Sequence, residues 1–314
     1  MRRAAGQGSF AEALVTGGVN TRLDRIAALL DWRCLERLLA GVYASGTGRP
    51  SYPPLVLLKV LLLESWYGLS DPAMEEALGD RLSFRRFAGL GLEEAVPDHS
   101  TISRFRSLLA KRGLADAVFV EVARQLDAQG VTIRSGTLID ATVIASAAAE
   151  PRKQKGGGTA PNDPDARWVR RADGSARFGY KLHAAVDLGT GIVRRAVVTS
   201  ANVADVDQGH HLVCGDERAV YADKGYVGPR LRERLALSGI RNRVQKKAGK
   251  GRPLTRRETW RNILIGRRRG RIEAVFGALK RSYGLARMRL TGLARATAAT
   301  LLTLTAWNLA RAAA

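Results

Sequence analysis

Three residues in one basic run, Arg269, Glu273 and Lys280, have the types and spacing that phosphate chemistry requires. They stand four and seven residues apart in GRRRGRIEAVFGALKRSYG, a run that is predicted to be helical. At about 100° per residue, positions four and seven from Glu273 lie within about 40° of it, so the three share one face. A carboxylate in a line of cationic groups is suited to holding a divalent cation against a phosphate backbone. The ordinary alternative is an i, i+4 ion pair between Glu273 and Arg269.

Two further carboxylates occur where strands are predicted. Asp140 lies in the apolar run TLIDAT, where a charge is costly unless it is paired or coordinated. Asp223 ends a short strand in YADKGY, and Gly225 after it permits close approach of the backbone. With Glu273, they are what two Mg²⁺ ions need to bridge a scissile phosphate. Singly, Asp140 could instead pair with an arginine, and Asp223 could be a turn residue.

The charge of the chain indicates a polyanionic partner. Its 314 residues carry a net charge of +22, with 16 basic and 15 acidic residues in 1–130 but 35 and 14 in 131–314. The stretch 241–295 holds 18 basic residues and only two acids. Such a block binds phosphates, and 6% aromatic residues argue against stacking on single strands, so duplex DNA is expected. A disordered basic tail or a membrane-surface patch is the alternative, but alternation with apolar positions favours an ordered surface.

Other features favour a cytoplasmic protein. Cys34 and Cys214 are too few for a disulfide framework or a zinc cluster. The N-terminus has no apolar core of a signal peptide, and PLVLLKVLLL is interrupted by Lys59 and closed by Glu64, as in a buried helix rather than a membrane span. We therefore expect no membrane association, and a location where genomic DNA is within reach.

The pattern of elements predicts two domains. Residues 22–126 show helical spacing, with Ser70 or Asp71 and Ser100 or Thr101 as candidate helix caps. From about residue 130 the pattern changes to strands, which indicates an all-α domain over 1–130 and an α/β domain over 131–314. Strands are predicted in VTIRSGTLIDATVIAS and AVYADKGY, a hairpin turning at 187–191, a long surface loop over 151–179, and helices at 229–239, 257–282 and 294–312.

Several stretches resemble the DDE transposases of bacterial insertion sequences, in the branch named for insertion sequence five. They include GRPSYPPLVLLKVLLL, GLSDPAMEEALGDRLSFRRFAGL, PDHSTISRFR, TLIDATVIAS, FGYKLHAAVD, ANVADVDQ, YADKGY and RRRGRIEAVFGALKR. That family carries a Tyr, Arg, Glu, Lys signature with two, three and six residues between its members. Arg269, Glu273 and Lys280 match it, whereas Gly266 occupies the tyrosine position. Because tyrosine is not a metal ligand, this departure is expected to affect DNA positioning more than chemistry.

The resemblance implies an RNase H-like catalytic domain with a mixed sheet and flanking helices. It implies Asp140, Asp223 and Glu273 as the acidic triad, with two Mg²⁺ (or Mn²⁺) ions per active site. The expected substrates are double-stranded DNA at the terminal inverted repeats and at the target. A homodimer on DNA in the bacterial cytoplasm, associated with the nucleoid, is also expected. Only 49 residues separate Asp223 from Glu273, too few for a large inserted domain.

Secondary candidates concern DNA contacts. Arg269, Lys280 and Lys224 are expected beside the scissile phosphate. In DHSTISRFRSLLAKRG, Arg104 and Arg106 would face DNA if this helix recognises the element ends, although a packing or dimerisation role for the N-terminal helices is the alternative.

Other polar residues receive structural assignments. His183 is expected to be structural, and Asn202 and Asp205 to shape a turn. The pair His210–His211 is not spaced as a metal cluster.

Three functions fit these observations. The first is a transposase that cleaves and then joins DNA. The second is a catalytically inactive, sequence-specific repressor derived from a transposase, and the third is an RNase H-like nuclease that cuts without strand transfer. Retention of all three acids argues against the repressor.

Overall fold

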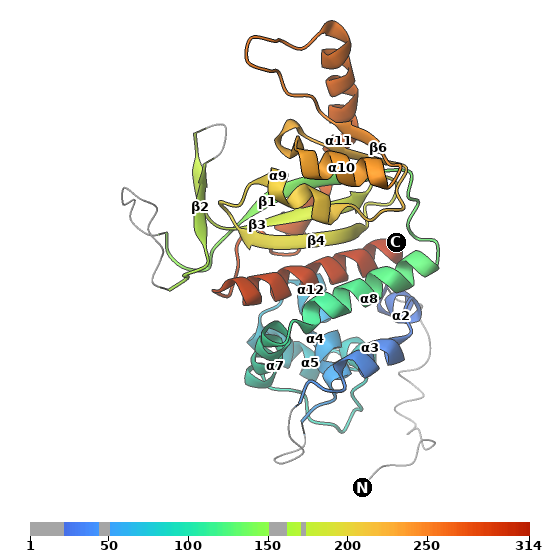
Figure 1. Cartoon of the computed structure of the whole chain (residues 1–314). Coiled ribbons are helices and arrows are strands. Elements are labelled where there is room, and N and C mark those ends of the chain that lie inside the picture. The colour runs from blue at the N-terminus through green and yellow to red at the C-terminus, as the bar shows by residue number, and fades with distance from the viewer. Residues whose placement is uncertain (1–21, 44–50, 151–161, 171–173) are drawn as a thin grey trace.

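The computed structural model describes residues 22–43, 51–150, 162–170 and 174–314 (Figure 1). Its N-terminal part consists of helices, as the spacing predicts. They are α2 (Arg22–Ala28), α3 (Trp32–Leu39), α4 (Pro54–Tyr67), α5 (Asp71–Asp80), α6 (Leu82–Ala88), α7 (His99–Lys111) and α8 (Leu114–Ala128). No described helix is long and apolar enough to cross a membrane. The apolar run in α4 is a buried helix, as expected, and it ends at Gly68 with a φ of 67°.

Helix caps in this region are partly as predicted. Ser70 caps α5 by accepting a hydrogen bond from the N–H of Ala73. The prediction for α7 was wrong, because Asp98 is its cap rather than Ser100 or Thr101. The Asp98 carboxylate accepts hydrogen bonds from the Thr101 N–H (2.7 Å) and the Ser100 hydroxyl (2.6 Å). Asp98 prevails because its ionised oxygens are stronger acceptors than a hydroxyl for the unpaired N–H groups of the first turn.

A six-stranded mixed sheet follows. Its strands are β1 (Thr137–Ala145), β2 (Arg167–Arg170), β3 (Ala176–Asp187), β4 (Val193–Ser200), β5 (Ala219–Ala222) and β6 (Arg241–Val244). The order is β2-β3-β1-β5-β6, and β4 also pairs with β3. β3 runs antiparallel to β1, whereas β5 and β6 continue the sheet in parallel. The predicted hairpin is confirmed, since the Asp187 carboxylate accepts hydrogen bonds from the N–H groups of Gly189 and Thr190 in its turn.

The predicted loop over 151–179 was wrong for its second half. Strand β2 and the start of β3 lie in this range and pair with each other. The rings of Trp168 and Phe178 pack in a tilted arrangement across the pair, with centroids 5.5 Å apart, and such cross-strand aromatic contacts stabilise a sheet. The signal was missed because only two apolar residues stand in β2, among Arg, Asp and Gly. Residues 151–161 and 171–173 lie outside the described part of the chain.

Helices cover both faces of the sheet. On one face lie α9 (Asp205–Gln208), η1 (Gly209–Leu212), η2 (Lys224–Tyr226) and α10 (Pro229–Leu237); α11 (Arg256–Ser282) and α12 (Leu293–Ala312) lie on the other. Successive residues of β1 point alternately into the hydrophobic cores on the two faces of the sheet. Leu138 joins the core of the α11 and α12 side, whereas Ile139 packs with Val220 and Leu231. This layering is the predicted α/β fold of RNase H-like type, preceded by a helical N-terminal region.

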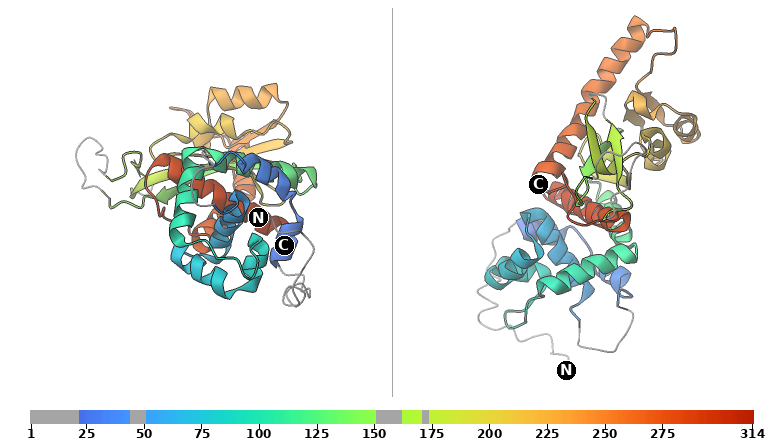
Figure 2. Two further views of the ribbon diagram at one scale, coloured as in Figure 1. Left: turned by 90° about the horizontal axis from the view of Figure 1, so that it is seen from below. Right: turned by 90° about the vertical axis from the view of Figure 1, so that its left-hand side faces the viewer.

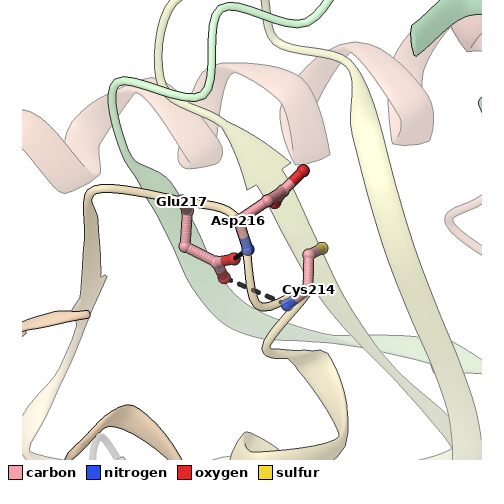
Figure 3. A group of neighbouring side chains, drawn as sticks. All are labelled: Cys214, Asp216 and Glu217. Atoms are coloured by element: carbon pink, nitrogen blue, oxygen red, sulfur yellow. Dashed lines mark hydrogen bonds between the residues drawn. The ribbon is translucent and has the colours of Figure 1, made fainter. Parts of the chain in front are cut away.

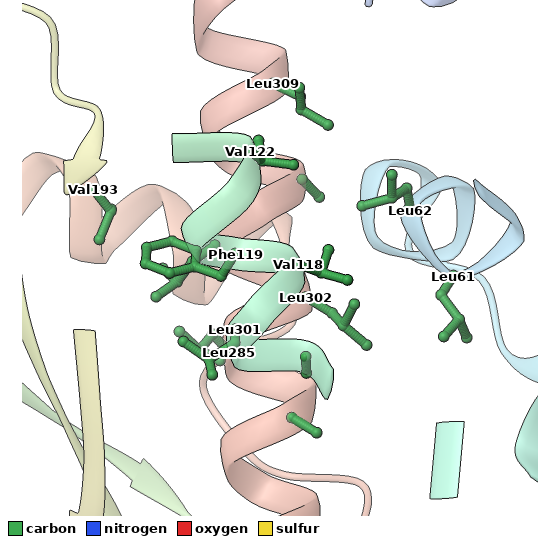
Figure 4. Packing of buried hydrophobic residues seen from close by; sticks show 14 of the residues in the cluster. Leu61, Leu62, Val118, Phe119, Val122, Val193, Leu285, Leu301, Leu302 and Leu309 are labelled. Carbon is green, nitrogen blue, oxygen red and sulfur yellow. The ribbon is translucent and has the colours of Figure 1, made fainter. Parts of the chain in front are cut away.

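The C-terminal helix α12 lies between the sheet and the N-terminal helices (Figures 1 and 2). Its apolar residues pack against α4 and α8 in one continuous core (Figure 4). Polar contacts anchor it on both sides: the Trp66 indole donates to the Ala306 carbonyl (2.8 Å), and Asn308 bonds both backbone groups of Val193. Residues from both ends of the chain therefore build one core, and the proposed domain boundary at 130/131 stays a prediction.

Candidate active site

Asp140 and Asp223 lie at the same level on two neighbouring strands. The parallel register of β1 and β5 pairs Thr137 with Val220. Each aspartate follows its member of that pair by three residues, so the same register places them side by side. The two acids are 83 positions apart in the sequence, and the crossover between β1 and β5 brings them together.

Asp223 begins the 3₁₀ turn η2 directly after β5. Its Oδ1 accepts a hydrogen bond from the N–H of Gly225 at 2.7 Å. A Cβ on residue 225 would lie 2.9 Å from that oxygen, which explains the glycine. The turn leaves Asp223 half-buried and Lys224 exposed at the end of the strand.

The pKa of Asp140 is raised. Burial, with a smaller contribution from the charge of Asp223, raises its pKa to about 6. The guanidinium of Arg269 and the N–H of Ala141 act in the opposite direction, at 2.8 and 2.9 Å from its carboxylate oxygens. The charge of this half-buried carboxylate is thus compensated by one arginine, the pairing that was the alternative to a metal role for Asp140.

Helix α11 supplies Arg269 and carries Glu273 one turn further along. A capping box between Thr255 and Glu258 begins the helix. Glu273 is exposed and lies on the flank of α11 that also carries Arg269. Among the described residues, the ligand atoms of Asp140, Asp223 and Glu273 do not all come within 4.8 Å of one another. The structure thus brings two of the three acids together, with Arg269, and places Glu273 one turn along α11 from Arg269, on the same flank.

The pair of aspartates has the chemistry of a divalent-cation site. Both offer carboxylate oxygens, the ligands that Mg²⁺ and Mn²⁺ prefer. Burial of Asp140 and repulsion from Asp223 both disfavour the anionic form of Asp140, and its pKa is raised accordingly. A cation would offset these two costs, and in the structure the guanidinium of Arg269 does so in part. The donor set therefore fits a divalent metal ion.

A buried polar network on β3 was not predicted. The Lys181 ammonium donates to the Asp205 carboxylate (3.0 Å) and to the Val203 carbonyl (2.7 Å). His183 is fully buried, bonds Thr199 through Nε2, and has Nδ1 3.7 Å from Asp205. Burial and the nearby Lys181 lower the pKa of His183 to about 3, so this histidine stays neutral, as expected of a structural residue.

Tyr226 links this network to the aspartates. Burial raises the pKa of its hydroxyl well above the usual value, and Asp205, Asp140 and Asp223 raise it further. That hydroxyl finds no hydrogen-bond partner among the described residues. Asp205 therefore does more than shape a turn, because its charge lies near Lys181, His183 and Tyr226 directly behind the site. The spacing FGYKLH, with a lysine and a histidine on one face of a strand, was the available signal.

Cys214, Asp216 and Glu217 form the one described group with metal-ligand spacing (Figure 3). The Glu217 carboxylate already accepts hydrogen bonds from three successive backbone N–H groups, those of residues 214–216. Asp216 forms an ion pair with Arg194 at 2.6 Å, and burial raises the pKa of the Cys214 thiol to about 11. Both carboxylates are thus engaged within the protein, where they stabilise a tight turn.

Arg106, which was expected to contact DNA, is engaged within the protein. Its half-buried guanidinium lies between Glu64 (2.5 Å) and Asp71 (2.7 Å) and joins α7 to α4 and α5. Removing the guanidinium would leave two neighbouring carboxylates without their cation, so this side chain holds the helices together, and a DNA contact by Arg106 stays a prediction. Arg104, by contrast, is exposed and bonds Ser100 on its own helix. Lys224 is exposed and Lys280 is half-buried on α11, so both stay candidates for phosphate contacts.

Gly266 stands in the middle of α11, where glycine lowers helix stability. A Cβ there would meet only the Gln245 side-chain nitrogen, at an ordinary 3.5 Å. We predict that Gly266→Ala raises the free energy of unfolding by roughly 0.5–1 kcal/mol, because alanine loses less backbone entropy in a helix. Urea denaturation would measure this. The matched control is Gly68→Ala, which should destabilise because residue 68 has a φ of 67°.

Two family models together match most of the chain. One, described as "Transposase domain (DUF772)", matches residues 11–108, and the other, described as "Transposase DDE domain", matches residues 131–309. Among solved structures, the chain is similar to that of the "piggyBac transposase synaptic complex with hairpin DNA". The two are 11% identical, with a TM-score of 0.45, over 93% of this chain and 74% of that one.

Proposed function

Because the chain belongs to the DDE transposase family, we propose that Asp140, Asp223 and Glu273 are the acids with which this DNA transposase cleaves and joins DNA. Enzymes of this family generally use divalent metal ions. The observation that carries the assignment is the placement of Asp140 and Asp223 at one level of adjacent strands, with α11 beside them. We also propose that two ions, Mg²⁺ or Mn²⁺, are held per site.

The reaction consists of two displacements at phosphorus. In the first, water attacks the scissile phosphodiester at the element end, the bond from phosphorus to the 3′-oxygen breaks, and that oxygen takes up a proton. In the second, the freed 3′-hydroxyl attacks a target phosphodiester, loses its proton, and releases a target 3′-hydroxyl. Bound metal ions would activate the attacking oxygen and stabilise the leaving one.

The residues of the chain supply position and charge. Asp140 and Asp223 would hold the cations, and Glu273 would complete the ligand set from α11. Arg269 stabilises the half-buried Asp140 anion in the free protein, at 2.8 Å. Its guanidinium, with the ammonium groups of Lys224 and Lys280, would contact phosphates beside the scissile bond.

The proposed partners are the terminal inverted repeats of the element and a target duplex. The net charge of +22, concentrated after residue 130, supports binding to a polyanion of this size. Since two ends must be processed, we propose a homodimer on DNA, acting at the bacterial nucleoid. Arg104, exposed at the start of α7, is retained as a candidate contact to the element ends.

The test is an assay that scores cleavage and joining separately. A donor duplex bearing the inverted repeats is incubated with the purified chain, a supercoiled target and Mg²⁺ or Mn²⁺. We expect nicked ends and joined products that chelation with EDTA abolishes. Cleavage without joining would instead establish the nuclease. Specific binding of the repeats without cleavage would establish the repressor.

A further inference from the structure

The first turns of α11 project beyond the sheet (Figure 2). Three large apolar side chains in these turns are exposed and form an apolar stripe. Trp260, Ile263 and Leu264 are 57%, 43% and 45% exposed. Their spacing of three and four residues places them on one face of the helix. Large apolar side chains that are grouped and exposed in this way mark an interaction surface more often than scattered ones do.

The opposite face of the same turns is fixed to the body. Arg261 donates to the carbonyls of Val244 and Asn242, at 2.9 and 3.1 Å. Asn262 exchanges two hydrogen bonds of 2.9 Å with the backbone of Lys246. The Lys246 ammonium is also 2.7 Å from Glu258. The stripe therefore lies on a part of α11 that is anchored to the rest of the protein.

The positive charge around the stripe favours a polyanionic partner. Arg256, Arg257 and Arg267 are exposed and lie within about 60° of Trp260 around the helix. Residues 241–270 contain 12 basic residues and one acid, Glu258, which lies on the fixed face. A second copy of this segment would be repelled by the same charges, whereas a nucleic-acid backbone would be attracted.

The chemistry of the stripe suits DNA of any sequence. Within about 60° of Trp260, α11 carries only arginines and apolar residues over positions 256–271. Arginine reads guanine in the major groove but also binds phosphates at any sequence, and this face has no amide or carboxylate to read the other bases. Arginines on phosphates and apolar side chains wedged at base steps bind through the backbone and through deformability. Element ends must be recognised by sequence, but a target duplex need not be.

The position of the stripe adds a geometric requirement. Trp260 precedes Glu273 by 13 residues, or about 20 Å along the helix axis. It also lies on the flank of α11 away from Arg269 and Glu273, by about 140–180°. A straight duplex seated at the acids would not cover both flanks. A kink at an inserted side chain, which reaches roughly 20–90°, would supply part of the turn that a duplex must make around α11.

Resting on the proposed function, we propose that Trp260, Ile263 and Leu264 form a wedge that bends the target duplex toward the acids. The surrounding arginines hold the target backbone on either side of the wedge. The stripe thus acts in strand transfer into the target and not in cleavage of the element end.

Separate measurement of the two steps tests the wedge. For Trp260→Ala we expect end cleavage within about twofold of wild type, and joining to an intact target reduced roughly tenfold. A target with a central mismatch, which bends at lower cost, should restore most of the joining. Trp260→Phe keeps an apolar ring and should stay near wild type. The matched control is Leu237→Ala, which removes an apolar side chain that is 86% exposed on α10.

Other outcomes would overturn the proposal. Equal loss of cleavage and joining would mean that the stripe holds the element end. Loss of a dimer in size-exclusion chromatography would identify a second copy as its partner, and unchanged joining would leave the stripe without a role. If wild type neither cleaves nor joins, the proposed function fails. Bending of a doubly labelled duplex of arbitrary sequence, followed by energy transfer, would then still decide whether Trp260 bends DNA.

Discussion

Asp223→Asn should reduce cleavage at the element ends by on the order of a thousandfold or more, while changing affinity for DNA little. The physical reason is that an amide is a much poorer ligand for a hard cation than a carboxylate. The amide of this variant would still present an oxygen to the N–H of Gly225, so the turn that follows β5 should persist. Cleavage of a labelled end at saturating Mg²⁺, beside a binding isotherm at fixed salt, would measure both quantities.

Two controls make this experiment specific. Asp80→Asn removes one charge at an exposed position at the end of α5 and should leave cleavage unchanged. Thermal unfolding of Asp223→Asn should match that of wild type, which excludes misfolding as the cause. Full cleavage by Asp223→Asn would refute the assignment of this residue. The same experiment with Asp140 and Glu273 tests the other two members of the proposed triad.

Arg269→Gln should lower cleavage at neutral pH by roughly tenfold to a hundredfold and shift its pH dependence. In the free protein the Asp140 pKa is about 6, so this carboxyl becomes protonated as the pH falls through that value. Removing the guanidinium removes the main influence that lowers this pKa, so the pKa should rise. The acid limb of the pH–rate profile should therefore move to higher pH.

Arg269→Lys distinguishes charge from geometry. A lysine keeps the positive charge but not the planar fork of donors, so we expect an intermediate rate with the acid limb near its wild-type position. Arg281→Gln, at an exposed position on the same helix, is the matched control for loss of one charge. An acid limb that stayed in place in Arg269→Gln would mean that the pair with Asp140 does not govern the ionisation that matters.

The structure also changes how the N-terminal helices are understood. The predicted recognition helix carries Arg104 on its surface and holds the half-buried Arg106 between Glu64 and Asp71. That ion network, together with the packing of α12 against α4, α7 and α8, joins the N-terminal helices to one another and to the rest of the protein, and whether they also bind DNA or form a dimer stays a prediction. The projecting start of α11 is more strongly basic than the N-terminal helices, so it is the stronger candidate for contacts to DNA beyond the active site.

The sequence by itself determined the local features of this protein. Helices such as α11 and α12, the hairpin at Asp187 and the strand that bears Asp140 follow from periodicity and turn chemistry, which act over a few residues. The concentration of positive charge after residue 130 needs no fold to be recognised. The three acids were also identifiable as candidates, because each stands in a setting that is unusual for its type.

Only the tertiary structure decided which of these residues meet and which become buried. Asp140 and Asp223 lie side by side because β1 and β5 are neighbouring parallel strands. Arg106 is partly covered because it forms ion pairs with two acids that lie 35 and 42 residues away in the sequence. The Lys181–Asp205 pair and the central position of α12 likewise join distant segments. Local sequence patterns state that a helix has an apolar face, but the partner of that face is set by packing through space. For the same reason, the exposure of Trp260, Ile263 and Leu264 became visible only in the folded chain.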